Sequence, residues 1–395
     1  MGIGDLVALR GIVLCAGVTV ALVAVIIVGV LLPRRFARTE RARMRDHLLQ
    51  GVTLLLAGSL ALATVGLWMN RTYVMYPTWA DLLLGSGDVG TAQTSGAATA
   101  PPPSAAAESA PVSTVQRDPL HDRALTGVQQ TDAGQWVSST IIGSASNVTS
   151  SALIYLPPGY MSHPERRYPV ILAFSGIPGS PATFRDAFQL GSVLDEHAAD
   201  GKMPNAIVVA SAVYPGHEDT ECVDRSATTG KAKHGTQWET WIAKDVVGFA
   251  KTHLRTIEDP AAWATLGYSA GGWCATMISV RHPDIARTSL SMAGYFQPDY
   301  GKGQEWNKQD DPRYDLVRIV KDDPPPVRMY LFMGQDDPLP KPTLAKMQKV
   351  LTKDSPTSLT VQSTPRGGHA VTLWISHLDA TLDWLSSTTP AFGPT

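Results

Sequence analysis

One stretch of the chain has the spacing that activates a serine hydroxyl. Residues Gly267–Gly271 read Gly-Tyr-Ser-Ala-Gly and match the pattern G-x-S-x-G. In this pattern the serine lies on a strained turn between a strand and a helix, and only glycine lets neighbouring backbone approach so closely. A strand-like run, Ala262–Leu266, precedes the motif, and a helix-like run, Trp273–Arg281, follows it. The context favours Ser269 as a nucleophile that forms a covalent acyl intermediate.

A serine of this kind needs a histidine base, which follows it in the chain. Three histidines follow Ser269. His282 falls where the helix after the motif should end, and His377 falls inside an amphipathic helical run. His369 lies in the glycine-containing segment 366–370, between a strand-like and a helix-like run. We therefore expect His369 to be the base.

The acid that orients the histidine should lie at the end of a strand. The run Val327–Met333 is strand-like, and Gly-Gln-Asp-Asp-Pro follows it. Asp337 is the expected acid, and Asp336 remains the alternative. The carboxylate that is not used should cap the loop or lie in solvent.

Two backbone N–H groups are needed to stabilise the oxyanion of an acyl-transfer intermediate. One should belong to Ala270, which follows the nucleophile, and the other to a loop after an earlier strand. That loop is Ser175–Gly179, in which Pro178 has no N–H, so Ile177 is the candidate donor. An ordinary glycine–proline turn is the alternative interpretation of this loop.

Alternating apolar runs supply the elements that must position these residues. The expected strands are Ala152–Leu156, Tyr168–Ser175, Ala206–Val213, Ala262–Gly267, Thr288–Met292, Val327–Met333 and Leu359–Ser363. The expected helices are Trp241–Leu254, Leu344–Leu351 and Val371–Leu385. Alternation of strands and helices predicts an α/β fold with a mostly parallel sheet flanked by helices.

Two long uncharged runs near the N-terminus predict transmembrane helices, at about 12–32 and 48–69. Each is long enough to cross a bilayer, and a secretory signal has a shorter apolar core followed by a cleavage site. The connection between them contains Arg34, Arg35, Arg38, Arg41, Arg43 and Arg45, against Glu40 and Asp46. Short arginine-rich loops stay in the cytoplasm, so the rest of the chain is expected outside it. A pair of buried core helices is the alternative.

Composition divides the chain into three parts. We expect a membrane anchor at 1–84, a low-complexity spacer at 85–133 and a catalytic domain at 134–395. The stretch Gly85–Val115 is mostly Gly, Ala, Ser, Thr and Pro, a composition that cannot bury a core.

At the residues described above, the chain resembles the bacterial esterase D-like branch of the α/β-hydrolases, which also contains the mycolyltransferases. The similar segments are Phe174–Ile177, Asp219–Asp224, Trp238–Thr240, Gly267–Ala275 and Gly367–His369. The resemblance covers roughly residues 150–386. It implies an α/β-hydrolase sheet, a Ser-acid-His triad, no metal and no organic cofactor.

The resemblance also assigns individual residues. It carries over Ser269 and His369, with Ile177 and Ala270 as oxyanion donors. The mycolyltransferases use a glutamate as the acid, whereas this loop offers aspartates, as the ordinary esterases do. Ser-Gly stands at residues 175 and 176 in place of the usual Asp-Gly of that branch.

Cysteine use fits the expected location outside the cytoplasm. The chain has three cysteines, and Cys15 lies in the first apolar run, where it should remain a free thiol. Similar cysteine pairs in the resembling esterases, together with an oxidising compartment, imply a Cys222–Cys274 disulfide. Two buried free thiols are the alternative.

The overall expectation is a membrane-embedded serine esterase that acts on an ester-containing small molecule or an envelope lipid or glycolipid. A net charge of −2 suggests no nucleic-acid partner. An acyltransferase that moves an acyl group to an envelope sugar or lipid hydroxyl shares the same acyl-enzyme and is the first alternative. A non-catalytic binding protein on a hydrolase fold is the second. The acidic loop His217–Glu221 is expected to be solvated, and the long segment Tyr295–Pro326 to be either a substrate-selecting rim or a surface excursion.

Overall fold

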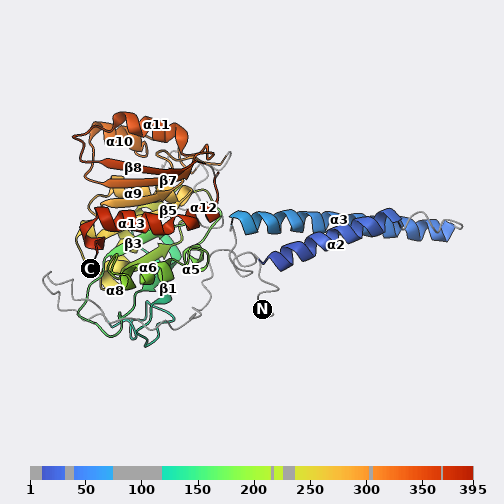
Figure 1. Ribbon diagram of the computed structural model, residues 1–395, viewed down its shortest axis with the longest axis horizontal. Helices are drawn as coiled ribbons and strands as arrows, with labels where there is room; N and C mark the ends of the chain where they lie inside the picture. The colour runs from blue at the N-terminus through green and yellow to red at the C-terminus, as the bar shows by residue number, and fades with distance from the viewer. Residues whose placement is uncertain are drawn as a thin grey trace. The chain divides into compact units, whose positions relative to one another are not determined.

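The computed structural model describes residues 11–31, 40–73, 118–214, 218–225, 236–301, 306–365 and 368–394. The chain divides into two compact units, Met1–Leu83 and Leu84–Thr395. Figure 1 shows the first unit as a pair of helices in blue and the second as an α/β unit in green to red. The stretch Gly85–Val115, predicted to be a spacer, lies outside the described residues.

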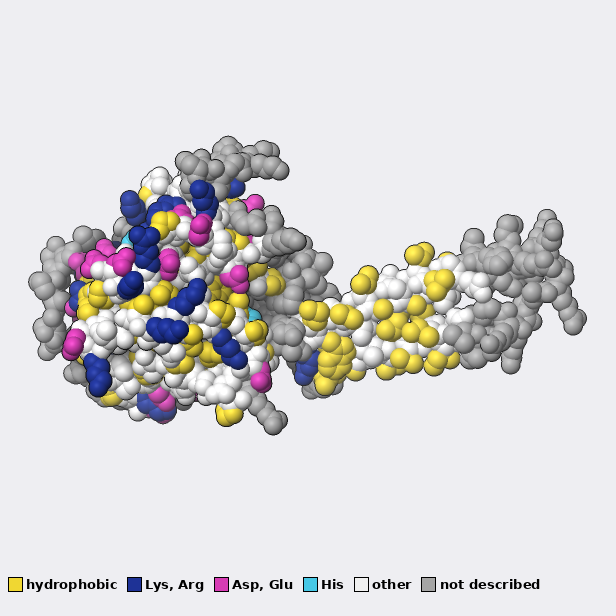
Figure 2. Space-filling model, turned by 90° about the horizontal axis from the view of Figure 1, so that it is seen from above, with side chains coloured by type: hydrophobic (Ala, Val, Ile, Leu, Met, Phe, Trp, Pro, Cys, Tyr) yellow, Lys and Arg dark blue, Asp and Glu magenta, His cyan; other side chains and the backbone are white. Residues whose placement is uncertain are grey.

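The first unit is a helical hairpin made of α2 (Ile12–Leu31) and α3 (Glu40–Tyr73). Within these helices, the segments Ile12–Gly29 and Gln50–Arg71 are long and apolar enough to be candidate membrane spans. Large apolar side chains of both helices point away from the pair, and Figure 2 shows them as yellow atoms along its surface. A surface of this kind suits an apolar surrounding.

The two helices run antiparallel, and side chains of α2 bond to residues of α3. The indole nitrogen of Trp68 donates a hydrogen bond of 3.1 Å to the hydroxyl of Thr19. The Cys15 sulfur lies 3.8 Å from the backbone oxygen of Leu67 and is a free, buried thiol, as expected.

The second helix begins earlier than predicted. Residues 40–47 were expected in the connecting loop, but α3 is already helical from Glu40. Hydropathy detects the part of a helix that suits a bilayer, whereas helix formers such as Glu, Arg, Ala and Met extend the helix beyond it. The remaining connection, residues 32–39, lies outside the described residues.

The second unit is built on one mixed sheet with the strand order β1-β2-β4-β3-β5-β6-β7-β8. The strands are β1 (Gln135–Gly143), β2 (Val148–Leu156), β3 (Val170–Phe174), β4 (Ile207–Ser211), β5 (Trp263–Tyr268), β6 (Thr288–Met292), β7 (Arg328–Gly334) and β8 (Ser358–Thr364). β1, β2 and β4 pair antiparallel, and every pair from β4 to β8 is parallel. The prediction of a mostly parallel sheet is confirmed, and β1 is an additional strand that the sequence analysis did not include.

Helices flank this sheet. They are α5 (Ala182–Asp186), α6 (Leu190–Ala199), α7 (Trp238–Thr240), the π-helix η3 (Trp241–Val246), α8 (Val247–His253), η4 (Pro260–Ala262), α9 (Ala270–Arg281), α10 (Leu316–Asp322), α11 (Lys341–Val350), α12 (Val371–Ser376), α13 (Leu378–Thr388) and η5 (Pro390–Phe392). The predicted helix Val371–Leu385 is two helices, because the chain leaves helical geometry at His377.

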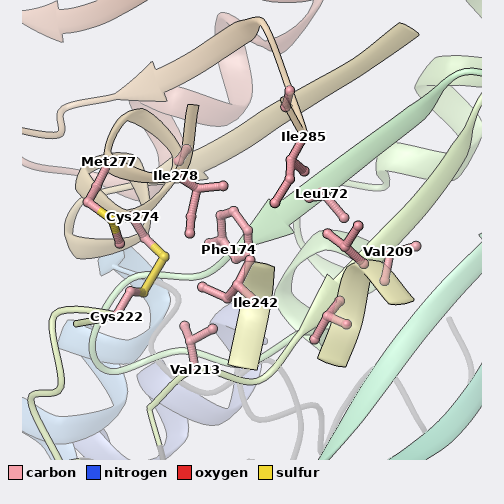
Figure 3. Packing of buried hydrophobic residues seen from close by; sticks show 14 of the residues in the cluster. Leu172, Phe174, Val209, Val213, Cys222, Ile242, Cys274, Met277, Ile278 and Ile285 are labelled. Carbon is pink, nitrogen blue, oxygen red and sulfur yellow. A yellow bond between two sulfur atoms is a disulfide. The ribbon is translucent and has the colours of Figure 1, made fainter. Parts of the chain in front are cut away.

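The core lies where α9 crosses the central strands. Every residue of β3, β4, β5 and β6 is buried, and α9 is buried from Ala270 to Val280. Figure 3 shows Phe174 in the middle of this cluster, with Ile278 and Ile242 around it. A helix buried on all sides cannot shift without opening cavities, so the turn that leads into α9 is held firmly.

The globular unit begins before Gly134, the boundary predicted from the sequence. The side chain of Leu125 is buried in the main hydrophobic cluster. Thr126 and Ser138 exchange backbone hydrogen bonds of 2.8 and 2.9 Å, which attach the segment to β1. Residues 118–133 therefore belong to the second unit. The polar composition of this segment did not indicate this, because two apolar side chains, Leu125 and Val128, and backbone pairing suffice to hold it.

The segment Tyr295–Pro326 is neither purely a rim nor a surface excursion. Its aromatic side chains Phe296, Tyr300, Trp306 and Tyr314 are all buried in the main cluster. Residues 302–305 lie outside the described residues. The aromatic residues thus pack the segment onto the domain.

Candidate active site

The turn between β5 and α9 presents Ser269. Its backbone has φ 56° and ψ −129°, a left-handed conformation that is rare for a residue with a side chain. A Cβ atom on Gly267 would collide with the backbone of Gly271, and one on Gly271 would collide with the backbone of Phe174. Any side chain at position 267 or 271 would therefore overlap with neighbouring backbone, which is the physical basis of the G-x-S-x-G pattern. Strain of this kind at one residue persists only where the surroundings impose it, as here.

Three predicted site residues form one chain of hydrogen bonds. The Ser269 hydroxyl lies 2.7 Å from Nε2 of His369. Nδ1 of the same imidazole lies 2.7 Å from Oδ2 of Asp337. With a proton on Nδ1, the imidazole donates to the carboxylate and accepts from the serine. This arrangement can take the serine proton as the oxygen attacks a carbonyl carbon.

The two adjacent aspartates lie in different surroundings. The side chain of Asp337 is fully buried, and its Oδ1 accepts a hydrogen bond of 3.0 Å from the backbone N–H of Leu339. Asp336 is exposed. The structure therefore brings Asp337, the expected acid, to His369. The other two histidines lie elsewhere: His282 bonds to Glu239, and His377 stacks on Phe332.

The loop after β3 lies directly against the nucleophile. A Cβ atom on Gly176 would come within 2.9 Å of Ser269 Cβ and of the Tyr268 backbone oxygen. Ile177 follows in this loop, and Ala270 is the first residue of α9. The first N–H groups of a helix have no acceptor within the helix, so that of Ala270 is available to a ligand. Both candidate oxyanion donors thus belong to backbone segments beside Ser269.

An aromatic cluster that the sequence analysis did not assign lies beside the site. The ring of Trp374 packs edge-on against His369, with centroids 4.8 Å apart. Tyr268 packs against Trp374 at 5.3 Å and stacks on Phe188 at 5.3 Å. Only their positions in the sequence could have indicated these residues, because Tyr268 directly precedes the nucleophile and Trp374 lies in the helix after His369.

Cys222 and Cys274 form a disulfide, in agreement with the expectation from the resemblance. Their Cα atoms are 5.7 Å apart, and both residues are buried. Figure 3 shows the bond in yellow beside Met277. The indole nitrogen of Trp273 also donates to the backbone oxygen of Glu221 at 2.8 Å. The loop 218–225 is therefore fixed to the helix that carries the nucleophile turn.

Two acidic residues of this loop are not solvated, so the prediction was wrong for Asp219 and Glu221, whereas Glu218 is exposed as expected. Glu221 and Asp219 are buried, and His217 lies outside the described residues. Glu221 Oε1 accepts from the hydroxyl of Tyr295 at 2.5 Å, and Asp219 Oδ2 accepts from the backbone N–H of Gly301 at 2.7 Å. Their second oxygens, Oε2 and Oδ1, are buried without a hydrogen-bond donor. Burial, with the charge of Asp219, raises the pKa of Glu221 well above its usual value.

Another buried carboxylate, that of Glu239, joins α7 to the end of α9. Glu239 accepts hydrogen bonds from His282 and Arg281 at 2.7 Å each and from the hydroxyl of Tyr314 at 2.6 Å. Burial favours the neutral acid, but these partners outweigh it and hold the pKa of Glu239 at about 2.

Among the described residues, no group of three His, Cys, Asp or Glu side chains could hold a metal ion.

Comparison with known proteins identifies the family of the chain and agrees with the fold. Residues 144–385, more than half of the chain, match the family described as "Putative esterase". An uncharacterised protein of Corynebacterium glutamicum is 28% identical over 182 residues, which is 44% of this chain and 40% of that protein. This chain thus spans less than half the length of that relative.

Solved structures of serine hydrolases have the same fold. A ferulic acid esterase has a TM-score of 0.56 at 20% identity, covering 66% of this chain and 100% of its own. An S-formylglutathione hydrolase from Agrobacterium tumefaciens has a TM-score of 0.56 at 16% identity, covering 67% and 99%. A fluorophosphonate-binding serine hydrolase of Staphylococcus aureus has a TM-score of 0.52 at 12% identity, covering 64% and 98%. At these identities the likeness establishes the α/β-hydrolase fold.

Proposed function

Because the chain belongs to this esterase family, we propose that it is a carboxylic ester hydrolase in which Ser269, His369 and Asp337 form the catalytic triad. The observation that carries the proposal is the continuous pair of 2.7 Å contacts from Ser269 through His369 to Asp337. Residues of three separate loops form the sequence of nucleophile, base and acid that acyl-transfer chemistry requires. A binding protein on the same fold would have no need for this alignment.

The reaction proceeds in two steps. Ser269 Oγ attacks the ester carbonyl carbon, and its proton passes to Nε2 of His369. Asp337 stabilises the imidazolium through Nδ1, and His369 then protonates the leaving alcohol oxygen. In the second step His369 removes a proton from water, and the water oxygen attacks the acyl carbon. The imidazolium then returns this proton to Ser269 Oγ as the carboxylic acid leaves.

Negative charge develops on the carbonyl oxygen in both steps. The backbone N–H groups of Ala270 and Ile177 donate hydrogen bonds to this oxygen, because both belong to the segments that border Ser269. Backbone donors fixed by buried elements need no reorganisation when the charge appears, which makes them effective.

The helical hairpin anchors the enzyme in a membrane under this proposal. Two long apolar segments with outward-facing large side chains support it, as does the arginine-rich connection, which holds its own side in the cytoplasm. The catalytic unit then lies on the opposite side, where its disulfide persists. The substrate is an ester-containing small molecule or an envelope lipid within reach of that surface.

A fluorophosphonate probe with a fluorescent reporter tests the chemistry. The full-length protein in detergent should be labelled and should hydrolyse 4-nitrophenyl acetate, and Ser269→Ala should lose both activities. Ser376→Ala, which removes a hydroxyl bonded to the backbone oxygen of Leu373, is the matched control and should retain both. Undiminished turnover by a folded Ser269→Ala protein would refute the proposal.

A further inference from the structure

We propose that Tyr268 is a positioning residue, whose hydroxyl fixes the loop Ser175–Gly179 beside the nucleophile and so sets the second oxyanion donor, Ile177. This inference rests on the proposed function and deepens it. Tyr268 is the variable residue that directly precedes Ser269 in the G-x-S-x-G motif. Tyr268 is therefore joined to the nucleophile through the backbone and lies beside the loop through its side chain.

The hydroxyl of Tyr268 contacts the loop at several points. Its polar neighbours there are the side chain of Thr183, the backbone of Gly176 and the side chain of Ser175. A Cβ atom on Gly179 would lie 2.6 Å from the hydroxyl oxygen, so the loop turns tightly around it. These groups all lie in the segment that follows β3. The hydroxyl therefore occupies the inside of the turn that carries Ile177.

The ring of Tyr268 cannot move away from this place. It is buried and stacks on Phe188 with centroids 5.3 Å apart, and Phe184 lies at 5.8 Å. Trp374 packs on it at 5.3 Å and also contacts His369. Aromatic packing on several sides therefore fixes the direction in which the hydroxyl points.

Backbone pairing fixes the start of the loop relative to Tyr268. Tyr268 is the last residue of β5, and β5 pairs in parallel with β3, from which the loop emerges. Gly176 approaches the Tyr268 backbone oxygen as closely as it approaches Ser269. Without the hydroxyl, the loop would keep its attachment to β3 but would lose the contact that sets its distance from the serine.

The consequence is specific to the transition state. An oxyanion hole works only when its donors lie about 2.7–3.1 Å from the oxyanion, and loss of one donor costs about 10²–10³-fold in kcat. A loop that is slightly misplaced should cost less than a lost donor. Tyr268→Phe keeps the aromatic packing and removes only the hydroxyl. We expect kcat to fall about 10–100-fold on this basis, with KM changed less than about twofold, because the ground-state ester does not depend on the oxyanion contact.

A matched control separates this effect from general loss of a buried hydroxyl. The hydroxyl of Tyr330 in β7 donates a hydrogen bond of 2.6 Å to Gln362, within the same sheet but outside the site. Tyr330→Phe should lower the melting temperature to a similar degree and leave kcat within about twofold of the wild type. An equal loss of kcat in both variants would overturn the proposal.

The decisive measurement uses an inhibitor that forms an oxyanion. A trifluoromethyl ketone forms a tetrahedral adduct with a serine nucleophile, so its Ki should rise in Tyr268→Phe by the same factor by which kcat/KM falls. Ser175→Ala, which removes one polar neighbour of the hydroxyl, should give a smaller loss, and the double variant should resemble Tyr268→Phe alone. Unchanged kcat and Ki in Tyr268→Phe would refute the positioning role. If Ser269→Ala remains active, the proposed function fails, and this result is independent of the behaviour of Tyr268.

Discussion

Asp336 and Asp337 show how strongly one position along a loop changes the role of a carboxylate. The first is exposed, and the second is fully buried between the N–H of Leu339 and the imidazole of His369. A buried carboxylate is an effective orienting group, because it stabilises the imidazolium in surroundings that screen charge poorly.

Exchange of each aspartate for asparagine tests this difference. In Asp337→Asn the imidazole loses its orienting charge and its preferred tautomer, and we expect kcat to fall about 10⁴-fold. Asp336→Asn changes an exposed charge and should leave kcat nearly unchanged. Hydrolysis of 4-nitrophenyl acetate by both purified variants provides the measurement. If Asp336→Asn is the inactive variant, the acid is one position earlier.

Glu221 and Asp219 differ from Asp337, because these two carboxyls are buried together and form no ion pair with a described Lys, Arg or His side chain. The pKa of Glu221 is raised above its ordinary value of 4.5 by burial and by Asp219. The pKa values of the neighbouring Tyr214, Tyr295 and Tyr300 are raised as well, in each case first by burial. The carboxyl of Glu221 therefore stays protonated to a higher pH in the folded protein than in the unfolded chain.

The sign of the resulting pH dependence follows from proton binding. Above pH 4.5 the unfolded chain releases the Glu221 proton, whereas the folded protein keeps it. The folded state then binds more protons, so the free energy of unfolding falls as the pH rises from 4.5 towards the raised pKa. We expect Glu221→Gln to remove this loss, because an amide is neutral and can donate to Asp219. Melting temperatures at pH 5 and pH 8 should show the variant gaining on the wild type at pH 8, and a larger pH-dependent loss in the variant would contradict the expectation.

At the scale of elements, the helix α9, which follows the nucleophile, and the loop 218–225 are attached to each other. α9 is buried on all sides, and the Cys222–Cys274 disulfide and the Trp273–Glu221 hydrogen bond attach the loop 218–225 to it. Glu221 and Cys222 both have positive φ angles, which the attached loop maintains.

Removal of the disulfide should therefore destabilise the protein. The double variant Cys222→Ala/Cys274→Ala opens a link across 52 residues, and loop-closure entropy predicts a loss of about 3–4 kcal/mol in the free energy of unfolding. Denaturant titration of the purified protein gives this value. Cys15→Ser, which changes the free thiol, is the control and should not alter the unfolding of the second unit. Two separately alkylated cysteines in a non-reducing peptide map of the wild type would rule the bond out.

At the scale of the whole molecule, the proposal joins an apolar hairpin to a hydrolase domain through a stretch whose composition predicts a spacer. Such an arrangement holds an esterase near the surface in which its hairpin is embedded. The composition of Gly85–Val115 also predicts ready cleavage by a protease.

Topology can be tested in intact cells. A protease added from outside should cut within Gly85–Val115 and release a fragment that contains the catalytic unit, because the arginine-rich connection keeps its side in the cytoplasm. The released fragment should still react with the fluorophosphonate probe. Protection in intact cells, with cleavage only after lysis, would invert the orientation.

The sequence by itself determined those features that depend on residues close together in the chain. The G-x-S-x-G motif lies within five residues, and the glycine contacts explain why its pattern is recognisable. The apolar spans and the strand runs of the parallel sheet are likewise local signals. The order of Ser269 and His369 could also be read from the sequence, although the two residues lie 100 positions apart. The expected disulfide, implied by the resemblance, is also present.

The tertiary structure decided the features that depend on contacts between distant segments. Only packing distinguishes Asp337 from Asp336, buries Glu221 and Asp219, and attaches residues 118–133 to β1. The place of the Tyr268 hydroxyl inside the Ser175–Gly179 loop joins residues about ninety positions apart, and no periodicity reports such a contact. The burial of a polar group is set by whatever folds over it, and the covering residues lie far away along the chain.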